Sequence, residues 1–171
     1  MKYSAQHWID KLEMQKHPEG GYFKEVYRSE ETIDRLSLNE RYGGDRNYAT
    51  AIYFLIAGED FSGFHKLNSD EIWHFYEGKS LIIHMISQDG KLTQKKLGHD
   101  WESGEQPMVV IPRHSWFAGE MIDKKAYTLF GCTVAPGFDF KDFILADKAK
   151  LSQQFPQHEK LIGRLVHDHV K

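Results

Sequence analysis

Short β-prone runs separated by turn residues recur along most of this 171-residue chain, and they limit what it can fold into. Many short strands at regular spacing are typical of a closed β-sandwich or barrel, since closure removes unpaired sheet edges. Within this series, Asp89-Gly90 predicts a hairpin turn of type I′. We therefore predict an all-β fold, with strands at residues 22–28, 48–56, 71–76, 80–87, 92–97, 108–112, 116–121 and 127–134.

Helical patterns lie toward the two ends of the chain. Ser4 can cap a short N-terminal helix whose apolar stripe consists of Ala5, Trp8, Ile9 and Leu12. Two C-terminal helices are predicted at residues 146–154 and 156–167, the second beginning with a proline, which the first turn of a helix tolerates. No linker rich in Pro, Gly or Ser divides the sequence, so we expect residues 1–171 to form a single domain.

The charge distribution argues against large polyanionic partners. The chain has 22 basic and 25 acidic residues, and neither sign collects at one end, so we expect no nucleic-acid partner and no membrane partner. The longest apolar run, residues 51–57, is too short to span a bilayer, and the first residues lack the apolar core of a signal peptide. With Cys132 as its single cysteine, the chain is expected to be cytoplasmic.

The stretch from Gly63 to Gly78 contains the strongest candidates for catalytic residues, above all His65 and Glu71. Side chains along a strand alternate between its two faces. If residues 71–76 form one unbroken strand, Glu71 shares a face with Trp73 and Phe75. The opposite face would then hold Ile72, His74 and Tyr76.

This stretch resembles the first motif of the cupin superfamily, G-x5-H-x-H-x3,4-E-x6-G. His65, Glu71 and Gly78 fall at the matching positions, but Leu67 stands where the second histidine of the motif should be. Four longer stretches resemble one uncharacterised cupin family, labelled a domain of unknown function and described as predicted sugar epimerases. These stretches are residues 17–23, 51–55, 69–78 and 134–143.

The second cupin motif is matched loosely, and it bears on metal binding. With two extra residues between Gly104 and Pro112, Phe117 falls where the motif has its histidine. Metal-binding cupins usually use two histidines and a glutamate of the first motif and one histidine of the second, so the resemblance retains His65 and Glu71 alone. Stable transition-metal sites offer three or four donors, which leads us to predict no metal and no other cofactor.

The resemblance implies a cupin double-stranded β-helix, or jelly-roll barrel, to which the patterns above add a short N-terminal helix and two C-terminal helices. It also implies a homodimer that exchanges N-terminal strands, here residues 22–28. In such a barrel, burial would raise the pKa of Glu71, whose charge would favour the imidazolium form of His65. A pair of this kind can transfer protons near neutral pH.

We therefore predict a small-molecule-binding cupin that acts as a metal-free epimerase or isomerase of a sugar or nucleotide sugar. His65 is the candidate base, oriented by Glu71 or Asp70, and Tyr22 or Tyr53 is the candidate acid. Aromatic rings at a barrel mouth can stack on a sugar ring. The predicted substrate-binding residues are Tyr22, Tyr53, Trp73, Phe75 and Phe117.

Three alternatives stay open on the sequence. The His65–Glu71 pair can be a buried, hydrogen-bonded pair without chemistry. The protein can be a ligand-binding module without turnover. It can also be a metal-dependent cupin of the oxygenase type that uses His65, Glu71 and His74, provided that a bulge turns His74 inward.

Overall fold

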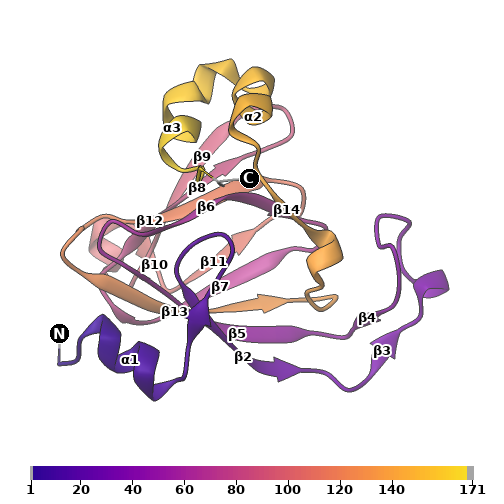
Figure 1. Cartoon of the computed structure of the whole chain (residues 1–171), viewed down its shortest axis with the longest axis horizontal. Helices are drawn as coiled ribbons and strands as arrows, with labels where there is room; N and C mark the ends of the chain where they lie inside the picture. Colours follow the sequence, from indigo (N-terminus) through magenta and orange to yellow (C-terminus); the bar gives the residue numbers. More distant parts are fainter. Residues whose placement is uncertain (1, 169–171) are drawn as a thin grey trace.

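Two six-stranded sheets pack face to face in the computed structural model, which describes residues 2–168 (Figure 1). The first sheet has the order β1 (Gln15–Lys16), β2 (Tyr22–Arg28), β5 (Thr50–Ala57), β13 (Tyr127–Val134), β7 (Glu71–Gly78) and β11 (Met108–Ile111). The second has the order β10 (Glu105–Gln106), β9 (Leu92–Leu97), β8 (Leu81–Ile86), β12 (Trp116–Met121), β6 (Phe61–Leu67) and β14 (Phe143–Leu145). The predicted all-β jelly roll is confirmed.

The main hydrophobic core lies between the two sheets, where the inward-facing side chains of successive strands meet. Trp73 of β7, Phe117 of β12 and Phe130 of β13 are fully buried there. The ring centroids of Trp73 and Phe130 are 4.6 Å apart. Aromatic rings therefore fill this part of the barrel interior, and any cavity must lie elsewhere in the barrel.

The helices cover the outer faces of the sheets. Helix α1 (Ala5–Lys11) begins where Ser4 Oγ accepts a hydrogen bond from the His7 amide, as predicted, and its apolar stripe packs on the first sheet. Helices α2 (Lys148–Gln154) and α3 (Glu159–Arg164) pack on the second sheet. Within the described residues, no helix is long and apolar enough to cross a membrane.

A long excursion joins β2 to β5 and contains the short strands β3 (Thr32–Ile33) and β4 (Arg46–Asn47). A buried ion pair fastens it to the barrel: Arg46 donates from Nε and Nη2 to the two carboxylate oxygens of Asp142, at 2.6 and 2.8 Å. Asn68, at the end of β6, donates to the same carboxylate at 3.0 Å. This network fixes the excursion beside one end of the barrel.

Four short 3-10 turns complete the structure: η1 (Arg35–Ser37), η2 (Trp101–Ser103), η3 (Phe140–Asp142) and η4 (Pro156–His158). The second predicted C-terminal helix is therefore shorter than expected. Pro156 opens η4 rather than an α-helix, and α3 ends at Arg164, so Leu165 and Val166 bury their side chains from beyond the helix.

Candidate functional site

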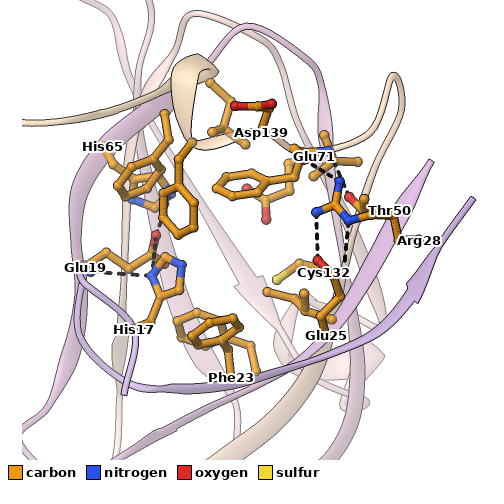
Figure 2. A pocket seen from close by; sticks show the side chains of 17 residues that line it. His17, Glu19, Phe23, Glu25, Arg28, Thr50, His65, Glu71, Cys132 and Asp139 are labelled. Carbon is orange, nitrogen blue, oxygen red and sulfur yellow. Dashed lines mark hydrogen bonds and ion pairs between the residues drawn. The ribbon is translucent and has the colours of Figure 1, made fainter. Parts of the chain in front are cut away.

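A cavity of about 320 Å³ lies inside one end of the barrel (Figure 2). Strands β2, β5, β6, β7 and β13 and the segment 138–143 supply its walls. Five phenylalanines contribute aromatic surface to it, namely Phe23, Phe54, Phe138, Phe140 and Phe143. The polar groups facing this cavity therefore stand in an apolar surrounding, where their protonation states depart from those in water.

One wall holds His65, Glu19 and His17, which lie together in Figure 2. The Nε2 atom of His65 and the Nδ1 atom of His17 each lie 3.3 Å from Oε2 of Glu19. The other oxygen of Glu19 accepts a hydrogen bond of 2.8 Å from Ser62 Oγ. The carboxylate of Glu19 thus contacts two imidazoles and a hydroxyl.

The loop that carries Glu19 depends on the two glycines that follow it. Gly20 has φ +101° and Gly21 has φ +70°, which favours glycine at both positions. A Cβ atom at Gly20 would lie 2.1 Å from the carbonyl oxygen of Phe61, on the strand that carries His65. This close approach lets the carbonyl of Glu19 accept a hydrogen bond of 2.7 Å from Gly63 N.

The C-terminal segment 165–167 also contacts strand β6. The carbonyl of Leu165 accepts a hydrogen bond of 2.8 Å from Phe64 N, the residue just before His65. The ring of His167 stacks on Phe61 at a centroid distance of 4.0 Å. The segment 165–167 therefore lies along the part of β6 that precedes the candidate base.

Burial and neighbouring charges shift the pKa values of His65 and Glu19 in opposite directions. Burial lowers the pKa of His65, although the negative charge of Glu19 opposes that effect. Burial alone would raise the pKa of Glu19, but the charges of His65 and His17 and two hydrogen bonds hold it below its usual value. Glu19 is therefore held in its carboxylate form, whereas burial opposes the imidazolium form of His65 that the sequence analysis expected to be favoured.

Glu71 reaches the same cavity from the first residue of β7. Burial, assisted by the negative charge of Glu19, raises the pKa of Glu71 to about 8, as the sequence predicted in direction. Its Oε2 atom is buried and has no hydrogen-bond partner among the described residues. Glu71 is therefore a neutral carboxylic acid at neutral pH, and one of its oxygens makes no hydrogen bond to the described residues.

The mouth of the cavity carries a second charged group. Arg28 donates from Nε and Nη2 to the carboxylate of Glu25, at 3.0 and 2.8 Å, on the side opposite the His65 wall (Figure 2). Hydrogen bonding to Glu25 raises the pKa of Arg28, and Asp139 adds to the effect. Arg28 is therefore a paired cation.

Comparison with protein families identifies the chain. The family model of the Cupin superfamily (DUF985) matches residues 6–146. The chain belongs to this family. It is 34% identical over 149 residues to an uncharacterized protein of Saccharomyces cerevisiae, a match that covers 81% of this chain and 73% of the yeast protein.

Solved structures agree with this assignment. A protein from Shewanella oneidensis shares 37% identity at a TM-score of 0.87, covering 96% of this chain and 98% of the other. A hypothetical protein from Leishmania major shares 34% identity at a TM-score of 0.88, covering 97% and 100%. Oxalate decarboxylase of Bacillus subtilis reaches a TM-score of 0.54 at 14% identity, covering 92% of this chain and 38% of the enzyme, a likeness of fold alone.

The metal-binding positions of a cupin are only half retained. Phe117 lies opposite His65 in the register of β12 and β6, and their rings are 4.0 Å apart between centroids, so an apolar ring stands where the resemblance expects a ligand. Leu67 lines the cavity at the other replaced position. Within residues 2–168, no group of three or more His, Cys, Asp or Glu side chains is arranged to hold a metal ion.

The alternative ligand set of His65, Glu71 and His74 is not assembled. His74 is absent from the described cavity lining, and its Nε2 atom lies 3.2 Å from Thr133 Oγ1, on the neighbouring strand β13. No bulge turns it inward, because the ladder between β7 and β13 keeps regular register through His74 and Gly131. This cupin site therefore does not fit the metal centre that the sequence left open.

The two predicted catalytic residues reach one cavity, but they are not partners. Among the described residues, no hydrogen bond or ion pair joins His65 to Glu71, and Glu19 takes the role expected of Glu71 or Asp70. Asp70 lies half exposed at the surface, where it accepts a hydrogen bond of 2.7 Å from Arg113 N. His65 and Glu71 therefore line the same cavity without contacting each other.

The predicted substrate-binding rings do not line the cavity that the described residues form. Phe117 and Trp73 are buried in the core, and Phe75 packs against that core with its ring 4.7 Å from His99. Tyr22 and Tyr53 belong to the cluster under α1, because alternation turns their neighbours Phe23 and Phe54 inward instead. These five assignments are corrected.

Sequence reasoning missed Glu19, His17, Glu25 and Asp139 as cavity residues. The paired glycines after Glu19 signalled an unusual backbone at that point. They could not reveal that the loop would meet β6, because this contact joins segments far apart in the chain.

Proposed function

We propose that the cavity binds a small molecule and transfers protons on it, as an epimerase or isomerase would. The observation that supports this most is that His65 and Glu71 line one cavity without bonding to each other, in a surrounding where burial opposes the charged form of each. General acid–base catalysis requires a base that is unprotonated and an acid that is protonated at the working pH, and burial favours these two forms in His65 and Glu71.

His65 is the proposed base. Its Nδ1 atom lies 2.8 Å from the carbonyl oxygen of Gly63, which can only accept, so this contact assigns the proton of the neutral ring to Nδ1. Nε2 then carries the lone pair, and it lies 3.3 Å from Oε2 of Glu19, so the guest's C–H bond must approach it beside that carboxylate. The nearby carboxylate of Glu19 would stabilise the imidazolium that forms, which makes Glu19 a positioning residue.

Glu71 is the proposed acid. Its proton can be donated to a carbonyl oxygen of the guest while His65 removes a proton from the adjacent carbon, which gives an enol, a Glu71 carboxylate and a His65 imidazolium. Return of the two protons, to the other face of that carbon or to its neighbour, completes an epimerisation or an isomerisation and restores both side chains. No redox partner is needed.

Hydrogen exchange tests this proposal directly. A panel of α-hydroxy ketones and aldehydes is incubated with the protein in D₂O, and deuterium at the carbon next to the carbonyl is measured by NMR. We expect incorporation with the wild-type protein, and a loss of at least about a hundredfold in His65→Gln and in Glu71→Gln, the lower range for removal of a general acid or base. His7→Gln, on α1 outside the barrel, is the matched control.

The rival function is ligand binding without turnover, and the fully engaged carboxylate of Glu19 favours it. The same assay separates the two. A ligand with an acidic C–H bond that binds in the cavity and acquires no deuterium from wild-type protein would contradict the enzyme and support the binding module.

A further inference from the structure

We propose that the guest of this cavity is an uncharged molecule with a flat apolar ring, and that phosphorylated and carboxylated compounds are excluded. This inference rests on the proposed function and narrows its substrate class. It favours an aryl or cyclic α-hydroxy carbonyl compound over a nucleotide sugar.

The first observation is the lack of an available cation. Among the described residues that line the cavity, Arg28 is the one permanently charged cation. Four of its five N–H donors are used: Nε and Nη2 bond Glu25, and Nη1 bonds Asn47 Oδ1 at 2.9 Å and the Phe138 carbonyl at 3.1 Å. An incoming phosphate or carboxylate would have to displace some of these contacts to bind Arg28 through two hydrogen bonds.

The second observation is the sign of the remaining charges. Glu19, Glu25 and Asp139 line the cavity, and Arg28 is the one permanently charged cation among the described lining residues. An anion placed beside these carboxylates would lose its hydration and gain no free counter-ion, which is costly in an apolar surrounding. The cavity therefore selects against negative charge.

The third observation is the nature of the walls. The rings of Phe138, Phe140 and Phe143 form an edge-to-face group, with centroids of Phe138 and Phe140 5.0 Å apart and of Phe140 and Phe143 5.9 Å apart. Phe23 and Phe54 add two more rings. The phenyl rings offer no hydrogen-bond partner to the hydroxyls of a sugar, whereas a flat ring gains contact area on them.

The unpaired oxygen of Glu71 gives the guest its orientation. A buried polar atom without a partner is costly, and a ligand group can remove that cost by bonding it. A carbonyl oxygen accepts the proton of the Glu71 carboxylic acid, so the polar end of the guest faces Glu71 and its ring lies among the phenylalanines. The cavity of about 320 Å³ suits a guest of this size.

Two matched probes test the charge preference. The neutral 2-hydroxyacetophenone and the anionic phenylglyoxylate share a phenyl ring and an adjacent carbonyl group. Binding near neutral pH is followed by NMR through the methyl signals of Ile52, which lines the cavity. We expect the neutral probe to bind at least about tenfold more tightly, which corresponds to about 1.4 kcal/mol.

A variant with a weaker preference strengthens the test. Glu25→Gln removes a negative charge and one of the two oxygens that accept from Arg28, so the preference for the neutral probe should fall by about tenfold or more. Glu102→Gln, an exposed carboxylate in η2 that does not line the cavity, should leave it unchanged. Unfolding midpoints verify that both variants fold.

Equal or tighter binding of phenylglyoxylate, or failure of both probes to shift the Ile52 signals, would overturn the inference. Neither result would decide the proposed function, because that depends on deuterium incorporation over the wider panel. Deuterium incorporation into an anionic compound would support the proposed function and contradict the inferred substrate class.

Discussion

Glu19 and Glu71 are two carboxyl groups of one cavity, yet their surroundings shift their pKa values in opposite directions. Two imidazoles and a hydroxyl surround Glu19 and keep it ionised, whereas Glu71 is buried with one oxygen unbonded and stays protonated. Such a division between neighbouring carboxyls commonly separates a charge-stabilising group from a proton donor.

Glu71 should make the stability of the protein depend on pH. Because its pKa is about 8 in the folded state, against 4.5 for the model group, the folded protein keeps a proton that the unfolded chain releases, and stability falls as pH rises between these values. Glu71→Gln removes this dependence. Relative to wild type, we expect the variant to gain on the order of 3 kcal/mol between about pH 5 and pH 9, measured by urea unfolding.

The exposed Glu102→Gln variant serves as the control for that measurement, because it changes the same group outside the cavity. A difference between Glu71→Gln and wild type that is constant across the pH range would show that Glu71 is ionised in the folded protein.

Glu19 should control the titration of His65. Its negative charge raises the pKa of His65 against the larger effect of burial, so Glu19→Gln should move the His65 titration to lower pH. NMR of ¹⁵N-labelled histidine measures this shift without a substrate. Ser62→Ala, which removes only the hydroxyl bond to Glu19, should have a smaller effect, and an unchanged midpoint in Glu19→Gln would refute the coupling.

At this scale, sequence spacing located His65 and Glu71 because the motif fixes their positions on two adjoining segments. It could not find the partner of His65, since Glu19 arrives from a loop whose contact with β6 exists only in the folded chain. Alternation was also insufficient for Trp73 and Phe75, which face the interior side of β7 but pack in the core rather than beside the cavity.

Among the elements, β12 and α3 are joined by a charge network. Glu120 of β12 contacts Arg164 of α3 at 2.5 Å, and it also contacts Lys124 and His84, each at 3.0 Å. Although burial opposes the effect, these contacts lower the pKa of Glu120 to about 2. The network holds α3 against the outer face of the second sheet.

Glu120→Gln should therefore lower the free energy of unfolding by an amount that depends on pH. A carboxyl whose folded pKa is lowered contributes stability above its unfolded pKa of 4.5, and this contribution is lost as pH falls toward 2. We expect a loss of about 1–2 kcal/mol at neutral pH, reduced by solvent screening of the two exposed cations. Urea unfolding should show the difference shrinking in acid, and an equal loss at low pH would point to packing instead.

Elements were predicted well where the pattern is local. The Ser4 cap, the alternation of β7 and the β8–β9 hairpin depend on neighbouring residues. The turn type of that hairpin was wrong: Gly90 has φ +82°, but Asp89 is not among the residues with positive φ, and type I′ requires both. The Gly90 amide donates to Ser87 O at 2.9 Å instead, which makes a longer loop.

On the scale of the whole molecule, the edge of the first sheet is the place where we propose that a second copy adds. Strand β1 pairs only with the first two residues of β2, so among the described residues the rest of that edge has no strand beside it. Val26 and Tyr27 are 48% and 53% exposed there. Open edges of this kind are templates for strand exchange.

We therefore expect a dimeric mass in light scattering, as the cupin resemblance implied. Tyr27→Lys should weaken the dimer, because a lysine on an edge strand disfavours pairing. Trp101→Lys is the control, since Trp101 is an exposed ring in η2, on the second sheet's side of the barrel. A monomeric mass for the wild-type protein would rule out this mode of assembly.

The segment 165–167 connects the end of the described chain to the chemistry. Its Leu165 carbonyl accepts a hydrogen bond from the amide of Phe64. Strand β6, which carries His65, is therefore held in part by a segment that does not line the cavity. Proteolytic cleavage at this stretch would then disturb β6 while leaving every described lining residue in place.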